Sequence, residues 1–108
     1  MPATAVDSHC HLDIIADSLV ANGYSDIDVD AELASAAAVG ISRVVQVGVD
    51  VASSQWSADL AQRHPGVLAM VAVHPNEAGA GAASDEALAE IDRLAAEPRV
   101  RGIGETGL

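Results

Sequence analysis

The stretch VLAMVAV at residues 67–73, followed directly by His74 and Pro75, is the longest apolar run in the chain. Its length predicts a buried strand, because a helix that spans a membrane needs about 20 apolar residues. Strands that are apolar on both faces are typical of parallel sheets covered by helices. The run therefore predicts a strand in the interior of an α/β protein.

Strand-like and helix-like segments alternate on either side of this run. We predict strands at 4–6, 42–47, 67–73 and 100–103, and helices up to 38, over 52–63 and from Ser84 onward. Asp28 or Asp30 can cap the first helix, and Ser84 caps the last. The order β-α-β-α-β-α-β is typical of a parallel sheet. We therefore predict an α/β fold that forms the first half of a (β/α)₈ TIM barrel, which needs about 250 residues in full.

The chain has 108 residues, which is room for a single domain. It stops at Leu108, directly after the fourth predicted strand and without a helix to cover that strand. A parallel strand with one uncovered face exposes apolar surface. We therefore expect residues 1–108 to be the truncated N-terminal half of one barrel domain. Such a fragment would need the missing half or associate with itself.

Charge and cysteine content exclude several classes of protein. Sixteen acidic residues against five arginines give a formal net charge of −11. A chain this acidic offers no general basic surface to duplex nucleic acid or to an anionic membrane. The single cysteine, Cys10, excludes an intramolecular disulfide and fits a reducing compartment. With no signal peptide evident at the N-terminus, we expect a soluble, cytoplasmic protein with no membrane partner.

A histidine pair follows the first predicted strand. His9 and His11 are two residues apart, so in an extended segment both rings project to the same face and can bind one ion. Asp7 and Asp13 could accept a hydrogen bond from a ring N–H on that side. Cys10 points the opposite way and is predicted to be a small buried hydrophobe. The alternative is two polar loop histidines that happen to lie close together.

Two further strands end in residues that can do chemistry. His74 follows the third predicted strand, and Glu105 follows the fourth within a glycine-rich segment. Ligands of parallel α/β folds bind at the carboxyl ends of the strands. Taken singly, His74 could cap a turn or helix and Glu105 could be an exposed turn carboxylate. Three strand ends that carry such residues favour one shared site.

Three blocks of sequence resemble the TatD family of metal-dependent deoxyribonucleases. They are DSHCHLD at 7–13, AVHPNE at 72–77 and GIGETGL at 102–108, and they occur in the family's order and spacing. The resemblance runs from Val6 to the last residue. The middle block departs from the family, which usually has Gly where Ala72 stands and often a second His where Asn76 stands.

The resemblance implies a TIM barrel of the amidohydrolase type with a site for two divalent ions, Mg, Mn or Zn. His9 and His11 would bind the first ion, and Glu105 would bridge both. His74 would lie on the substrate side, near the scissile phosphate. The family's remaining ligands lie on later strands, which this chain lacks.

The leading hypothesis is therefore a metal-dependent phosphodiesterase that cuts DNA, with Glu105 and His74 as catalytic residues. Two ions would activate water, so no side chain is needed as a covalent nucleophile. The acidic chain favours weak contact with DNA, through single strands or ends. Two alternatives stay open: a related hydrolase of amides, esters or lactones, and an inactive fragment that folds against a partner half.

Overall fold

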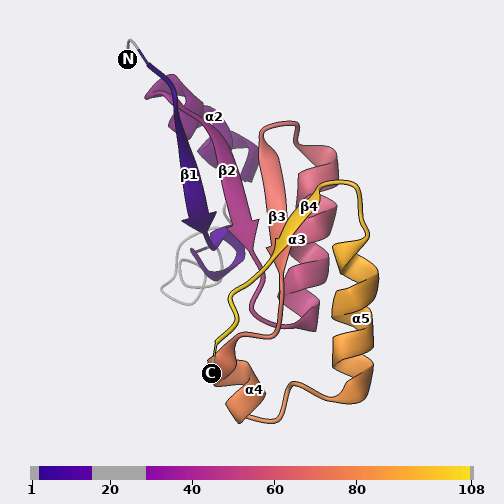
Figure 1. The fold of residues 1–108 in the computed structure, drawn as a ribbon. Helices are drawn as coiled ribbons and strands as arrows, with labels where there is room; N and C mark the ends of the chain where they lie inside the picture. The colour runs from indigo at the N-terminus through magenta and orange to yellow at the C-terminus, as the bar shows by residue number, and fades with distance from the viewer. Residues whose placement is uncertain (1–2, 16–28, 108) are drawn as a thin grey trace.

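The computed structural model describes residues 3–15 and 29–107 of the chain. Four strands form one sheet: β1 (Ala5–Cys10), β2 (Ile41–Val47), β3 (Val67–Val71) and β4 (Val100–Ile103). All neighbouring strands are parallel, and they lie side by side in the order of the sequence (Figure 1). Consecutive βαβ units of a barrel have this arrangement. The predicted α/β class is confirmed, with strands ordered as in the first half of a TIM barrel.

Helices connect the strands, and the three longer ones cover one side of the sheet. The helices are α2 (Val29–Ala38), α3 (Val51–Arg63), α4 (Pro75–Gly79) and α5 (Asp85–Ala95). The core lies where α3 and α5 pack on the sheet (Figure 1). Leu60 and Leu94 are fully buried there. Burial of each such side chain contributes about 1.5–3 kcal/mol. None of the described helices has both the length and the apolar character needed to cross a membrane.

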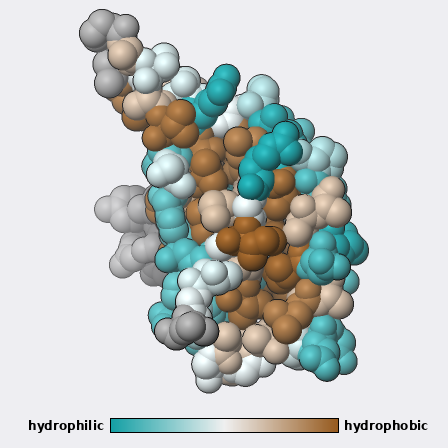
Figure 2. Space-filling view, in the orientation of Figure 1, coloured by the Kyte–Doolittle hydropathy of each residue, from teal (hydrophilic) through white to brown (hydrophobic). Residues whose placement is uncertain are grey.

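Strand β3 shows how the two faces of the sheet differ. Val67, Ala69 and Val71 are buried in the core beneath the helices, whereas Leu68 and Met70 are only half-buried. This follows from the alternation of side chains between the two faces of a strand. Figure 2 shows hydrophobic side chains gathered over the strands on the face turned to the viewer. Within the described part of the chain, one apolar face of the sheet is therefore partly open.

Strand β1 is longer than predicted. It continues past residue 6 to Cys10, and it pairs with β2 through partners that include Cys10 and Gln46. The residues after Val6 have little preference for strands on their own, and pairing with β2 supplies the missing stabilisation. His9 therefore lies within the strand instead of following it.

The third strand and the segment after it also differ from the prediction. Strand β3 ends at Val71 and not at residue 73, and the following residues lead into the short helix α4, which was not predicted from the sequence. Pro75 is the first residue of α4, where its fixed φ favours the helix and its missing N–H costs nothing. The pattern that marks α4 is therefore its Pro, not an apolar stripe.

Capping side chains set where the longer helices begin. Ser84 caps α5, as predicted, by accepting a hydrogen bond at 3.1 Å from the backbone N–H three residues on. Helix α3 begins one residue earlier than predicted, because Asp50 accepts a hydrogen bond from the backbone N–H of Ser53 at 2.8 Å. Asp30 lies in the first turn of α2 and not at its N-cap. The other candidate cap, Asp28, lies outside the described residues.

Arg99, which directly precedes β4, joins that strand to the end of α3. Its guanidinium donates hydrogen bonds to the carbonyls of Ala61 at 3.1 Å, His64 at 3.4 Å, Pro65 at 2.8 Å and Val67 at 2.7 Å. The last carbonyls of a helix have no partner within the helix. One side chain therefore supplies hydrogen-bond donors to the backbone carbonyls between the end of α3 and the start of β3.

Candidate metal centre

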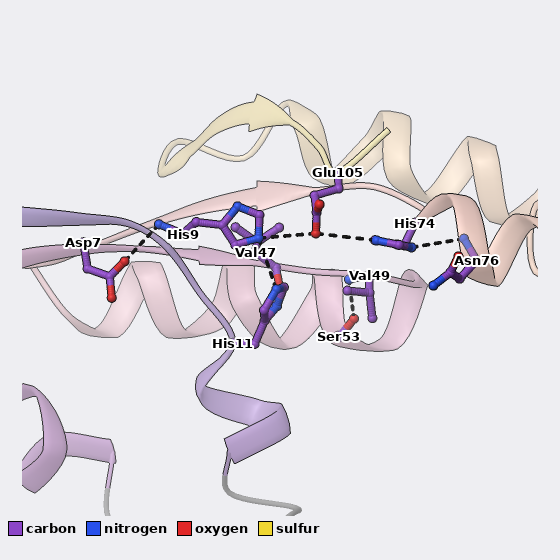
Figure 3. Close-up of polar contacts among 9 residues, drawn as sticks. All are labelled: Asp7, His9, His11, Val47, Val49, Ser53, His74, Asn76 and Glu105. Atoms are coloured by element: carbon purple, nitrogen blue, oxygen red, sulfur yellow. Dashed lines mark hydrogen bonds and ion pairs between the residues drawn. The ribbon is translucent and has the colours of Figure 1, made fainter. Parts of the chain in front are cut away.

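Three side chains of the kind that bind metals meet at the carboxyl end of the sheet. His9 lies in β1, His11 directly follows it, and Glu105 follows β4. Nε2 of His9 lies 3.2 Å from Nε2 of His11 and 3.3 Å from Oε2 of Glu105 (Figure 3). One ligand atom of each residue lies within 4.8 Å of the other two. The structure thus brings together the three residues predicted to bind a metal.

This contact joins the two edges of the four-stranded sheet. Strands three positions apart in a flat sheet would be separated by roughly 14 Å, because neighbours are spaced about 4.7–4.9 Å apart. His9 and Glu105 come from β1 and from the end of β4, yet they approach to 3.3 Å. The two side chains therefore lean toward each other across a curved sheet, as they would from the wall of a barrel.

The separations fit a divalent ion. Zinc binds imidazole nitrogen and carboxylate oxygen at about 2.0–2.2 Å, and tetrahedral geometry then places neighbouring ligand atoms roughly 3.3 Å apart. The two separations measured from Nε2 of His9 are 3.2 Å and 3.3 Å. Imidazole suits several divalent metals, and carboxylate suits Mg and Mn. The donor set therefore fits a metal without selecting one.

The orientation of the His11 ring leaves the correct nitrogen free. Nδ1 of His11 lies 2.9 Å from the carbonyl oxygen of Val47 in β2, so Nδ1 carries the proton and donates it (Figure 3). Nε2 then keeps its lone pair and faces His9. The predicted aspartate acceptors are not used for this ring: Asp7 accepts from the backbone N–H of His9 at 3.1 Å, and Asp13 accepts from Gln46 at 2.8 Å.

His74 has two contacts, one on each ring nitrogen. Nδ1 accepts a hydrogen bond from the backbone N–H of Asn76 at 3.1 Å and thereby caps α4 (Figure 3). Nε2 must then carry the proton, and it lies 3.6 Å from Oε2 of Glu105. In the sequence analysis, capping a helix and belonging to the site were alternative roles for His74. The structure is compatible with both, because capping through Nδ1 leaves the Nε2 proton facing the Glu105 carboxylate.

The backbone of His74 is held by the loop after β2. Its N–H donates to the carbonyl of Val49 at 2.7 Å, and the N–H of Val49 donates to Oγ of Ser53 at 2.8 Å (Figure 3). Ser53 in turn belongs to the capping box that begins α3. The start of α3 therefore fixes the loop against which His74 rests.

Sequence reasoning missed Gln46, which is fully buried in β2. Its Oε1 accepts from the backbone N–H of Leu12 at 2.8 Å and lies 3.8 Å from Sγ of Cys10, and its Nε2 donates to Asp13. Its signal in the sequence is a polar residue between Val45 and Val47, in the otherwise apolar second half of the strand.

Cys10 is half-buried and packs against the core, in keeping with the prediction of a small hydrophobe. Burial, together with the nearby charges of Asp7 and Asp13, raises the pKa of its thiol to about 11. Its Sγ faces Oε1 of Gln46 at 3.8 Å, and Cys10 is not among the described residues whose ligand atoms meet in this cluster.

Comparison with known proteins places these residues in a family context. The family described as "TatD related DNase" matches residues 6–108 of the chain. The chain is 42% identical over 104 residues to an "uncharacterized metal-dependent hydrolase TatD" from Mycobacterium tuberculosis, which covers 95% of this chain and 36% of that protein.

Two further relatives carry the name "3'-5' ssDNA/RNA exonuclease TatD". The protein from Cronobacter turicensis is 33% identical over 82% of this chain and 33% of its own length. The protein from Escherichia fergusonii is 35% identical over 75% of this chain and 30% of its own length. The chain thus spans about a third of the length of the curated relatives it matches.

Proposed function

Because the chain belongs to the TatD related DNase family, we propose that it is part of a metal-dependent phosphodiesterase that cuts DNA. The observation that carries the proposal is the convergence of His9, His11 and Glu105, whose ligand atoms lie within 4.8 Å of one another. Relatives named as 3'-5' ssDNA/RNA exonucleases support a nucleic acid as the substrate.

In this proposal, Nε2 of His9 and Nε2 of His11 would hold the first of two divalent ions. Glu105 would supply carboxylate oxygen to both ions. The chemistry that bound Mg, Mn or Zn supplies is polarisation of the phosphoryl oxygen and activation of water. Nε2 of His11 has the lone pair that a ligand needs, because the Nδ1 proton of His11 is engaged by Val47. The second ion needs ligands beyond these three.

His74 acts on the substrate side as a hydrogen-bond donor. Since Nδ1 accepts from Asn76, the Nε2 proton is the one available to a phosphate oxygen. Its position 3.6 Å from Glu105 puts this donor beside the proposed metal ligands. A donor aimed at developing negative charge on the phosphate would stabilise the transition state.

The substrate is held weakly and through single strands or ends. The side chains of His9 and Glu105 are 46% and 42% exposed, so a phosphate can reach them from solvent. The net charge of −11 opposes any long contact with a polyanion. Attraction to DNA is therefore confined to the metal centre, which favours a flexible strand or end over a long duplex.

Residues 1–108 form the N-terminal half of one TIM-barrel domain in this proposal. Four sequential parallel strands with a partly open apolar face support it, as does the match to about a third of each relative. The remaining strands would complete the wall and add ligands for the second ion.

The test is hydrolysis by the complete protein that contains residues 1–108. Single-stranded DNA, duplex DNA and RNA are each supplied with Mg²⁺ or Mn²⁺, and chelation by EDTA serves as the control. We expect metal-dependent release of nucleotides, fastest from single strands. A panel of amide, ester and lactone substrates runs in parallel, and turnover of that panel without cleavage of DNA would replace the nuclease with the related hydrolase.

A further inference from the structure

Gln46 is a polar side chain in a place where an apolar one would pack. It is 0% exposed and stands between Val45 and Val47 in an otherwise apolar part of β2. A buried amide is unfavourable unless its donors and acceptors find partners. Gln46 finds them in one place, the segment that carries the metal-ligand histidines.

The partners of Gln46 lie on both sides of His11. Oε1 accepts from the backbone N–H of Leu12 at 2.8 Å and lies 3.8 Å from Sγ of Cys10. Nε2 donates to Oδ1 of Asp13 at 2.8 Å. The amide therefore contacts the residue before His11 and the two residues after it, and none of these hydrogen bonds goes to the ring of a histidine or to Glu105.

The next residue of the same strand holds the ring. The carbonyl of Val47 accepts the Nδ1 proton of His11 at 2.9 Å, and the carbonyl of His11 accepts from the N–H of Ile15 at 3.1 Å. Two successive residues of β2 thus constrain the backbone and the imidazole of His11. Without Gln46, the segment from Cys10 to Asp13 would lose its hydrogen bonds to the β2 side chain, and the bond to Val47 would orient the ring on a less constrained backbone.

We propose that Gln46 is a positioning residue of the metal centre, which sets His11 so that its Nε2 faces Nε2 of His9. The inference rests on the proposed function in taking His11 as a metal ligand. Partners that orient metal ligands typically change metal affinity by about 10–100-fold when they are removed. The hydrogen bonds to Leu12 and Asp13 are the means by which Gln46 would have this effect.

The experiment uses Co²⁺ as the metal and Gln46→Met in the complete protein as the variant. Met keeps the length and volume of the side chain but removes both hydrogen bonds. We expect Co²⁺ to bind at least about tenfold more weakly and its visible absorption bands to shift. The matched control is Gln62→Met, which removes only an exposed hydrogen bond to Glu97 at 3.0 Å and should leave Co²⁺ binding unchanged.

A second readout does not depend on metal or on cleavage of DNA. In ¹⁵N spectra of the metal-free protein, the Nδ1 proton of His11 should be protected in the unmodified chain and exchange faster in Gln46→Met. Unchanged His11 signals together with unchanged Co²⁺ affinity would overturn the role of Gln46. If the unmodified protein cleaves no DNA, that result counts against the proposed function. The ¹⁵N signals of the His11 ring still decide the role of Gln46 in that case.

A rescue variant separates positioning from general stability. Gln46→Glu combined with Asp13→Asn exchanges the amide and the carboxylate, so that a donor and an acceptor still face each other and the acceptor for Leu12 remains. We expect the pair to recover most of the lost affinity and the protection of the His11 ring. If Gln46→Met fails to fold, the pair decides: a folded double variant that leaves His11 unprotected would overturn the proposal.

Discussion

Oε2 of Glu105 lies 3.6 Å from Nε2 of His74, and the same oxygen lies 3.3 Å from Nε2 of His9. One carboxylate oxygen therefore lies between two rings that come from different strand ends. A group in this position can bind an ion beside His9 while it faces the donor of His74. The carboxylate is thus the point at which the proposed metal ligands and the proposed substrate donor meet.

We expect Glu105→Gln to lower turnover far more than substrate affinity. The amide keeps the shape of the side chain but supplies no charge to two ions, so the second ion should bind poorly. Turnover and substrate affinity are measured separately at saturating Mn²⁺, with Glu77→Gln on α4 as the matched control. A variant at position 105 that kept most of its rate would show Glu105 to be a turn residue.

His74→Asn and His74→Ala should separate the two functions of that ring. Asn is a good N-cap residue and should preserve α4, whereas Ala loses the cap at a cost of about 1 kcal/mol. Both variants remove the Nε2 proton that faces Glu105, so both should lose activity to a similar extent. Urea unfolding and nuclease rates of the complete protein provide the comparison. Full activity in His74→Asn would show that His74 only caps α4 and does not take part in the reaction.

His9→Ala combined with His11→Ala should abolish metal-dependent activity and leave the fold nearly intact. Residues at the carboxyl ends of barrel strands serve function more than stability. Nuclease activity with Mg²⁺ or Mn²⁺ is followed beside thermal melting. His64→Ala is the control, since His64 pairs with Asp30 away from the site. Activity retained in the double variant would rule out these two ligands.

Gly48→Ala should destabilise the protein by about 1–3 kcal/mol, because the new methyl group overpacks a filled space. A Cβ at position 48 would lie 2.4 Å from Oγ and 2.6 Å from Cα of Ser54. Ser54 has little room to move, since its Oγ lies 3.2 Å from both the N and the O of Ala72. The control is Gly79→Ala in α4, where a Cβ meets nothing within 4 Å. Equal urea midpoints for the two variants would contradict this packing.

Residues 1–108 expressed alone should associate with themselves and hydrolyse no DNA. In the described part of the chain, β1 and β4 are the edges of the sheet, and Val6 and Ile103 on them are 55% and 53% exposed. Open edges with apolar side chains favour pairing between chains. Light scattering after size-exclusion chromatography gives the mass, and a metal-supplemented assay gives the activity. A monomer that cleaves DNA would contradict both expectations.

Much of the fold could be predicted because short apolar runs and turn residues mark it clearly. The apolar run at residues 67–73 and the Ser84 cap both show plainly in the sequence, and the structure has a strand up to Val71 and a helix that begins after Ser84. The meeting of His9, His11 and Glu105 was also expected, since parallel strands bring their carboxyl ends to one edge. Their roles as ligands stay predictions.

The parts that were missed depend on contacts between distant segments. The residue types at positions 7–10 do not predict a strand. A strand forms there because the segment pairs with β2. Gln46 looks like a surface residue until the turn that carries Leu12 folds onto it. The periodicity of apolar residues describes one segment at a time. It cannot reveal a side chain whose hydrogen-bond partners all lie in another segment.

The guanidinium of Arg99 has a consequence at the opposite end of the molecule. It fastens the beginning of β4 to the corner after α3, and the far end of the same short strand delivers Glu105. An edge strand has a neighbour on one side only, so this tether guards it against sliding along β3. The position of the Glu105 carboxylate relative to the histidines therefore depends on the hydrogen bonds of Arg99, which lie at the other end of β4.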